Sequence, residues 1–259
     1  MRRAAHQLFD RPLVLVDPLA CHILGPQLQH RIVADRAVHE ESGSRHLRAL
    51  LVARSRYAED ALAATNGVRQ YVVLGAGLDT SALRGADPTL RIFEVDHPAT
   101  QAAKQMFIER AQIVIPPNVV FIAVDFETES LEAGLARSGF DAAAPAFFSW
   151  LGVTPYLTRD AILTTLRFVG ALRSGTEIVF DFAVPSSAAS PMAAKVGSIA
   201  EPWCTFFEPD ELIAVARSLG FSRANVVNHE ALNRLYFDGR DDGLRLRTTG
   251  QLMHARVGS

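Results

Sequence analysis

The stretch at positions 71–80, YVVLGAGLDT, constrains the fold more than any other part of the chain. Its apolar start, Tyr71–Leu74, has the length and the branched side chains of a buried strand. The strand ends directly in Gly75-Ala76-Gly77, where two glycines allow a sharp turn and leave no side chain to keep a ligand away. We therefore expect a strand followed by a ligand-binding turn, although a plain tight turn would use the same residues.

A second apolar run, Leu90–Val95, ends in the acid Asp96. A glycine turn after one strand and a carboxylate after the next is how open α/β sheets hold the ribose part of a nucleotide-like cofactor. The third glycine of the dinucleotide fingerprint is missing, because Thr80 stands in its place, and Asp79 would repel a diphosphate. These two differences count against NAD and favour a cationic ligand without phosphate, such as S-adenosyl-L-methionine.

Three motifs resemble the leucine carboxyl methyltransferase-like family of class I methyltransferases: VLGAGLDT at 73–80, FEVDHP at 93–98 and WLGVTPY at 150–156. The resemblance extends from about Arg11 to the C-terminus. It implies S-adenosyl-L-methionine as the cofactor and a Rossmann-like sheet in the strand order 3-2-1-4-5-7-6. Many family members have Glu directly after the position of Trp150, where this chain has Leu151. Either backbone carbonyls hold the amino group of the cofactor here, or the alignment shifts locally.

Strands and helices alternate as far as Phe182, which predicts an α/β fold with helices on both faces of a mostly parallel sheet. The segments 221–228 and 251–257 are expected to close this sheet as an antiparallel pair. Apolar spacing favours two helices between Gln27 and Ala64 and a short helix at Asp79–Leu83. We expect one domain over 1–259, with an N-terminal helical cap at 1–66, a cofactor-binding core at 67–182, an insertion or lid at 183–206, and the C-terminal part of the core at 207–259.

Further cofactor contacts are expected at the ends of the other strands and in the cap. The family places Asp125 at the exocyclic amine of the adenine, and the neighbouring Phe126 is suited to pack on the ring; a helix cap is the alternative for Asp125. His97 either caps a helix or lies beside the ribose. Arg54 matches the family's arginine that holds the cofactor carboxylate, whereas its sequence context alone favours a solvated helix face. The full set of predicted contacts is Arg54, Gly75, Ala76, Gly77, Asp96, His97, Asp125, Phe126 and Trp150.

The methyl group of a sulfonium is already activated, so a methyltransferase need only hold its acceptor in line and exclude water. A catalytic base is therefore optional, and no catalytic residue is assigned; the candidates are Tyr156, His97 and His22. Aromatic residues at 150, 156, 203, 206 and 207 are suited to form the acceptor pocket, or to pack in the core. We expect O-methylation of a small-molecule carboxylate or hydroxyl. The alternatives are an NAD-dependent oxidoreductase and a non-catalytic cofactor-binding protein of the same fold.

Composition narrows the setting of this activity. The formal net charge of −2, with acidic and basic residues interspersed, does not favour a nucleic-acid partner. No apolar run approaches the roughly 20 residues that span a bilayer, and the first residues lack a signal peptide's apolar stretch, so we expect a cytoplasmic protein without membrane contact. Cys21 and Cys204 suit neither a disulfide framework nor a zinc site, and no metal is expected. A homodimer is left open.

Overall fold

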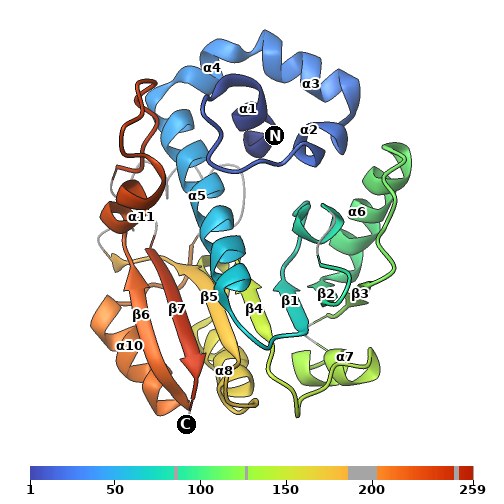
Figure 1. The fold of residues 1–259 in the computed structure, drawn as a ribbon, viewed down its shortest axis with the longest axis vertical. Coiled ribbons are helices and arrows are strands. Elements are labelled where there is room, and N and C mark those ends of the chain that lie inside the picture. Colours follow the sequence, from blue (N-terminus) through green and yellow to red (C-terminus); the bar gives the residue numbers. More distant parts are fainter. Residues whose placement is uncertain (85–86, 126–127, 186–202, 248–250, 259) are drawn as a thin grey trace.

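A seven-stranded sheet forms the centre of the computed structural model, which describes residues 1–84, 87–125, 128–185, 203–247 and 251–258 (Figure 1). The strand order is β3-β2-β1-β4-β5-β7-β6, as the family resemblance implied. Strands β1 to β5 are parallel, and β7 runs antiparallel to both β5 and β6. The strands are β1 (Gln70–Leu74), β2 (Arg91–Asp96), β3 (Val119–Ala123), β4 (Phe147–Trp150), β5 (Glu177–Phe182), β6 (Phe221–Val227) and β7 (Gln251–Val257).

The helices divide into an N-terminal group and those that alternate with strands. The N-terminal group is α1 (Arg2–Phe9), α2 (Leu19–His22), α3 (Gly25–Ala34), α4 (Arg36–Glu40) and α5 (Ser42–Ala64). The remaining elements are α6 (Pro98–Arg110), α7 (Leu131–Arg137), α8 (Arg159–Gly170), α10 (Pro209–Ser218), α11 (His229–Tyr236) and the 3-10 turns η1 (Ser81–Leu83) and η2 (Thr154–Tyr156).

Two helix predictions were wrong in detail. Three helices, not two, occupy the region from Gln27 to Ala64, because the backbone leaves helical geometry at Asp35 and again at Glu41. Neither break contains proline, so apolar spacing could not locate it. The short helix expected from Asp79 is a single 3-10 turn, since the Asp79 carboxylate accepts the N-H of Ser81 and holds the chain in a turn. Helix α11 was not predicted.

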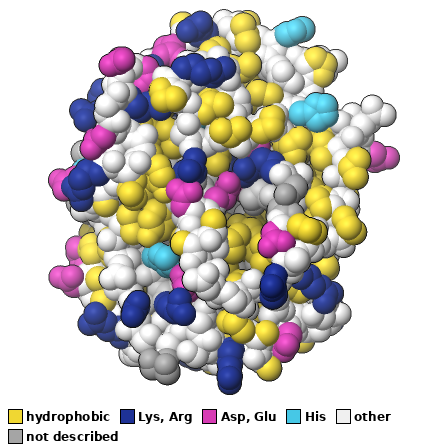
Figure 2. Space-filling model, in the orientation of Figure 1, with side chains coloured by type: hydrophobic (Ala, Val, Ile, Leu, Met, Phe, Trp, Pro, Cys, Tyr) yellow, Lys and Arg dark blue, Asp and Glu magenta, His cyan; other side chains and the backbone are white. Residues whose placement is uncertain are grey.

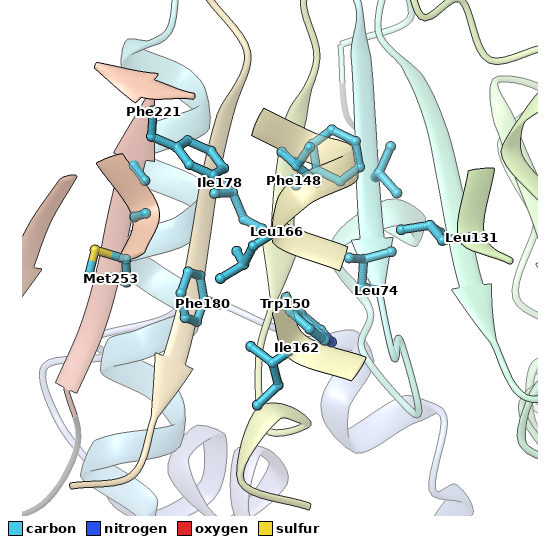
Figure 3. Packing of buried hydrophobic residues seen from close by; sticks show 14 of the residues in the cluster. Leu74, Leu131, Phe148, Trp150, Ile162, Leu166, Ile178, Phe180, Phe221 and Met253 are labelled. Carbon is cyan, nitrogen blue, oxygen red and sulfur yellow. The ribbon is translucent and has the colours of Figure 1, made fainter. Parts of the chain in front are cut away.

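Hydrophobic packing covers both faces of the sheet, as the alternation of strands and helices predicted. Along β1, Val72 and Leu74 join one cluster while Tyr71 and Val73 join the other, because successive strand residues point to opposite faces. The first cluster packs the sheet against α7, α8 and α10; Figure 3 shows Ile162 and Leu166 of α8 against the strand residues Trp150 and Phe180. The second cluster packs the sheet against α5 and α11. The site described below lies at the carboxyl ends of the parallel strands.

The cap helices lie above that edge of the sheet, and a buried polar cluster joins α1 to α5 (Figure 1). Arg48 of α5 donates from Nε and Nη2 to the two carboxylate oxygens of Asp10, at 2.7 and 2.9 Å. His6 Nδ1 lies 2.8 Å from Asp10, and His6 Nε2 accepts the N-H of Val14 at 3.0 Å, which assigns the ring proton to Nδ1. Burial raises the pKa of Asp10, but the hydrogen bonds from His6 and Arg48 hold it below its usual value. Within the cap, α1 is therefore held to α5 by charge as well as by apolar contact.

Three general features of the described residues bear on the predictions from composition: surface charge, helix hydrophobicity and the cysteines. Acidic and basic side chains are interspersed on the face shown in Figure 2, without a large area of one sign. None of the described helices is long and apolar enough to cross a membrane. Cys21 and Cys204 are both free thiols.

The end of α8 gives a test of the packing between α8 and α10. A Cβ added at Gly170 would collide with the carbonyl oxygen of Leu219, which is main chain and cannot rotate away. We expect Gly170→Ala to lower the free energy of unfolding by about 1–3 kcal/mol, the usual cost of overpacking. Denaturant titration followed by circular dichroism measures this change.

Gly43→Ala is the matched control, because Gly43 is exposed within α5 and an added Cβ would meet no atom within 4 Å. It should leave stability unchanged or raise it by up to about 1 kcal/mol through helix propensity. Equal effects of the two substitutions would contradict the close approach of α8 to the end of α10.

Candidate functional site

The glycine turn after β1 has the backbone that its sequence predicts. Gly75 and Gly77 adopt φ values of 63° and 48°, in the left-handed region that favours glycine. A Cβ at Gly75 would collide with the side chain of Val153, whereas one at Gly77 would meet no atom within 4 Å. Gly75 is therefore needed for packing within the protein, and Gly77 leaves open space beside the backbone.

Asp96, at the end of β2, fixes this turn directly. Its Oδ2 accepts the N-H of Gly77 at 2.6 Å, and its Oδ1 accepts the N-H of His97 at 2.7 Å. His97 is exposed and caps α6, where its Nδ1 accepts the N-H of Ala99 at 3.2 Å. His97 thus caps α6, and Asp96 joins the glycine turn to the start of this helix.

A cavity of about 430 Å³ lies between the glycine turn and the cap. This volume is within the range of small-molecule pockets, about 300–1,000 Å³. Helix α5, the end of β4 and the first two cap helices complete its wall. The lining residues are Met1, Arg2, Arg3, Ala4, Ala20, Ile23, Leu24, Leu51, Arg54, Val73, Leu74, Gly75, Ala76, Gly77, Leu78, Asp79, Ser149 and Leu151.

Arg54 is the basic residue that α5 contributes to this wall. Its Nη1 donates to Oδ2 of Asp181 on β5 at 2.6 Å, and Oδ1 of the same carboxylate accepts the N-H of Gly152 at 2.6 Å. Arg54 Nε is buried and has no hydrogen-bond partner among the described residues. A buried guanidinium nitrogen without an acceptor costs free energy, so this atom is available to an acceptor such as the carboxylate of a ligand.

Asp79 ties the glycine turn to the N-terminal helix. Its carboxylate pairs with Arg3 of α1, and Arg3 also donates to the hydroxyl of Ser55 on α5 at 3.0 Å. Arg3 and Lys104 hold the pKa of Asp79 well below its usual range, although its burial acts in the opposite direction. Asp79 therefore stays ionised and serves the cap, so that it is not available to repel or bind a ligand freely.

A buried ion pair supports the turn from below. Lys104 of α6 donates from Nζ to the carbonyl oxygen of Asp79 and to Oε2 of Glu94 on β2, each at 2.6 Å. Burial raises the pKa of Glu94 to about 7; Lys104 opposes this rise, while Asp79 and Asp96 add to it. Lys104 thus connects the main chain of the turn to the middle of the sheet.

Asp125, predicted at the adenine end, is not among the residues that line this cavity. Asp125 follows β3 and is half-buried, and its carbonyl oxygen accepts the N-H groups of Thr128 and Glu129 at 2.9 and 2.8 Å. Phe126 lies outside the described residues. The cavity thus brings together Arg54, Gly75, Ala76 and Gly77 of the predicted set, with Asp96 behind the turn.

The side chain of Trp150 belongs to the core and not to the cavity wall. It is 3% exposed and packs against Phe180, with ring centroids 6.1 Å apart. Its neighbours Ser149 and Leu151 line the cavity instead, because residues on either side of a strand position share the opposite face. Leu151 therefore presents an apolar side chain at the place where many family members have an acid.

The catalytic candidates occupy three separate places. Tyr156 is half-buried in η2, and His22 is exposed at the end of α2; neither lines the cavity. The end of the insertion packs against the loop of Tyr156, since Cys204 N-H donates to the carbonyl oxygen of Pro155 at 2.8 Å. Most of the insertion, 186–202, lies outside the described residues.

Sequence reasoning missed Arg3, Lys104 and Asp181. Arg3 and Asp79 are 76 positions apart, and no local pattern signals such a pair. The partners of Lys104, Glu94 and the carbonyl oxygen of Asp79, lie 10 and 25 positions away, so no local pattern signals them either. Asp181 carries the signal that identified Asp96, an acid near the carboxyl end of an apolar strand, so the same rule applied to 177–182 would have found it.

The sheet order, the glycine turn and the acid after β2 define a class I methyltransferase fold. Solved structures agree on this fold. A structure described as a "putative methyltransferase" from Thermobifida fusca YX has a TM-score of 0.59 at 18% identity, over 89% of each chain. Magnesium protoporphyrin IX methyltransferase (ChlM) from Synechocystis PCC 6803, solved with bound SAH, has a TM-score of 0.53 at 11% identity, over 86% of this chain and 92% of its own.

The sequence comparisons identify the family. The family model described as "Leucine carboxyl methyltransferase" matches residues 1–170, and the chain belongs to this family. The "Putative S-adenosyl-L-methionine-dependent methyltransferase YktD" of Bacillus subtilis is 28% identical over an alignment of 286 residues. This alignment covers 98% of this chain and 94% of that protein. SCO7813 of Streptomyces coelicolor, described in the same words, is 37% identical over 123 residues, 46% of this chain and 43% of its own. The methyltransferase class and the S-adenosyl-L-methionine cofactor expected from the sequence are confirmed.

The residues of the cavity fit this cofactor. The buried Arg54 Nε lacks an acceptor that a carboxylate would supply, and the open space at Gly77 admits a ligand against the main chain. The wall between these points is mostly apolar. The amino-acid part of S-adenosyl-L-methionine has the charge and size that this region accepts.

The buried Glu94 predicts a pH-dependent stability. Its pKa is raised from the ordinary value near 4.5 to about 7, so between these values the folded chain keeps a proton that the unfolded chain has lost. The folded state then binds more protons, and the free energy of unfolding falls as the pH rises through this window. Glu94→Gln should remove this fall, which denaturant titrations from about pH 4.5 to 8 would measure against the unmodified chain.

Glu177→Gln is the control with the opposite sign. Burial raises the pKa of Glu177, but His254 and Arg256 hold it below its usual value, so its contribution is present above the ordinary pKa and lost as the pH falls. A Glu94→Gln variant whose stability changes with pH as the unmodified chain does would overturn the assignment.

Proposed function

We propose that the protein transfers the methyl group of S-adenosyl-L-methionine to an oxygen of a small molecule, with a carboxylate favoured over a hydroxyl. The observation that carries this proposal is the charge of the cavity. Its lining side chains that titrate are Arg2, Arg3, Arg54 and Asp79, and Asp79 is already paired with Arg3. No histidine or glutamate is among the lining residues that the structure describes. A carboxylate acceptor suits such a wall, because it is already ionised near neutral pH and needs no general base.

Each proposed cofactor contact has a distinct task. Arg54 binds the carboxylate of the methionine part, and the open space beside Gly77 takes the main body of the ligand. Asp96 accepts from the ribose hydroxyls while it holds the turn, and Asp125 accepts from the amine of the adenine. The cofactor supplies an activated methyl group, so the protein's work is to place the acceptor oxygen in line and to exclude water.

The binding site for the methyl acceptor is proposed to lie at η2 and at the segment 203–207 that packs on it. Tyr156 is in η2, and Thr205 Oγ1 donates to the carbonyl oxygen of Leu157 at 2.5 Å. Trp203 and Phe206 are half-buried with ring centroids 6.5 Å apart, and buried Trp203 Nε1 has no partner among the described residues. Phe207 is a core residue, 1% exposed. Tyr156 and Trp203 are therefore the better candidates for a wall that contacts the acceptor.

The domain organisation, the class of substrate and the location of the protein are also proposed. The cap and core act as one domain, because Arg3 and Arg54 of the cap pair with Asp79 and Asp181 of the core. The interspersed charges favour a small-molecule substrate over nucleic acid. A cytoplasmic location and either a monomer or a homodimer are consistent with this enzyme.

A screen with methyl-labelled S-adenosyl-L-methionine tests the reaction. Among carboxylic acids and phenols, we expect label to appear first in a carboxylic acid, as a base-labile ester. The rate should be independent of pH from about 6 to 9, since a carboxylate is ionised throughout that range. A methylation rate that falls below the usual histidine pKa of about 6.5 would instead support a hydroxyl acceptor with a base, provided that His97→Gln or His22→Gln removes this pH dependence. Label found only on nitrogen or carbon would overturn both versions.

Paired arginine variants test the cofactor contact. Arg54→Lys keeps a charge but loses the planar fork, so we expect weaker S-adenosyl-L-methionine binding, by about 1.5–3 kcal/mol for the lost charged hydrogen bond. Arg56→Lys should change it little, because Arg56 is partly exposed and pairs with Asp60 on the same helix at 2.7 Å. Calorimetric titration of both variants gives the comparison. The assignment of Arg54 fails if the two variants bind equally well.

A further inference from the structure

The contacts of Arg54 divide its guanidinium into two edges. Nη1 is taken by Asp181 at 2.6 Å, while Nε is buried without a partner among the described residues. The hydrogen bonds of the described residues include none from Nη2 either. The Nε–Nη2 edge is one of the edges that binds a carboxylate with two parallel hydrogen bonds. Asp181 thus occupies the other side of the fork and leaves a bidentate edge available.

Asp181 is itself fixed from a second direction. Its Oδ1 accepts the N-H of Gly152 at 2.6 Å, and its carbonyl oxygen accepts the hydroxyl of Thr154. Both donors belong to the loop that leaves β4, so the carboxylate is held by β5 and by that loop together. A carboxylate with both oxygens bonded has little freedom to rotate, and the arginine that it holds shares this constraint.

Gly152 also restricts the position of the Arg54 guanidinium by direct contact. It adopts a φ of 78°, and a Cβ at this position would lie 2.5 Å from Nη2 and 3.1 Å from Cζ of Arg54. The guanidinium therefore lies directly against the Gly152 main chain. Any other residue here would strain the backbone and push the guanidinium out of its place.

We infer that Asp181, with Gly152, is a positioning residue that orients the guanidinium of Arg54 for the carboxylate of S-adenosyl-L-methionine. This inference rests on the proposed contact between Arg54 and the cofactor. Asp181 touches neither the cofactor nor the acceptor in this role; it lowers the entropy that Arg54 must lose on binding. It also joins the cofactor contact to the loop that carries Tyr156.

The test is the affinity of two ligands for Asp181→Asn. S-adenosyl-L-homocysteine has the amino-acid part, and 5′-methylthioadenosine is the related nucleoside without it. We expect roughly tenfold weaker binding of S-adenosyl-L-homocysteine, within the range for a charged hydrogen bond, and unchanged binding of 5′-methylthioadenosine. Calorimetry on the full chain measures both, and Gly152→Ala should show the same pattern.

A double substitution separates positioning from general damage. In an Arg54→Met background, the added Asp181→Asn change should have no further effect on S-adenosyl-L-homocysteine affinity, because the residue through which it acts is gone. Glu177→Gln is the matched control: Glu177 is a buried acid on the same strand, at its opposite end, and it pairs with Arg256 at 2.6 Å. It should leave both affinities unchanged.

The outcomes distinguish this inference from the proposed function. Failure of the unmodified chain to bind S-adenosyl-L-homocysteine would overturn the proposed cofactor site as a whole. A loss in Arg54→Met without a loss in Asp181→Asn would overturn the positioning role alone. So would equal losses of both ligands in Asp181→Asn, or an undiminished effect of Asp181→Asn in the Arg54→Met background, since either would indicate a structural role that does not act through Arg54.

Discussion

The ion pair between Arg3 and Asp79 is the contact on which the site depends, because it fixes the cap to the glycine turn. Buried ion pairs are expensive to desolvate and contribute little net stability unless their geometry is good, but a partner left alone is costly. Asp79 also has Lys104 beneath its carbonyl oxygen, so the turn is held from above by the cap and from below by α6. The cavity exists only where these two supports place the cap over the strand ends.

Much of the fold could be predicted, because its information is local. Apolar runs located β1 and β2, the alternation of strands and helices as far as Phe182 predicted a mostly parallel sheet, and glycines and an acid at strand ends located Gly75, Gly77 and Asp96. The breaks at Asp35 and Glu41 carry no proline, and helix spacing alone cannot find such breaks. The partners of Asp79 and Arg54 lie 76 and 127 positions away in the chain, so only the folded structure brings them together. Sequence reasoning thus located the strand-end residues and missed most of what holds them.

The alternation of side chains along β4 shows what Leu151 does at the position where many family members have Glu. Residues at 149 and 151 face the cavity while Trp150 faces α8, so a side chain at 151 is in the wall and Leu151 makes that wall apolar. The neighbouring strand β5 supplies a carboxylate at nearly the same level of the sheet, in Asp181, whose oxygens are already bonded to Arg54 and Gly152. The acid beside this part of the site therefore binds an arginine of the cap rather than facing the cavity.

Charge balance then favours an anionic acceptor. S-adenosyl-L-methionine carries a sulfonium and an ammonium against one carboxylate. Among the arginines of the wall, Arg3 and Arg54 are paired with Asp79 and Asp181, which leaves the charge of Arg2. Once the cofactor carboxylate is bound to Arg54, positive charge is still in excess in a cavity where screening by water is weak. The carboxylate acceptor that we propose would reduce that excess on entry. Methyl transfer would then turn the sulfonium and the carboxylate into an uncharged thioether and an uncharged ester.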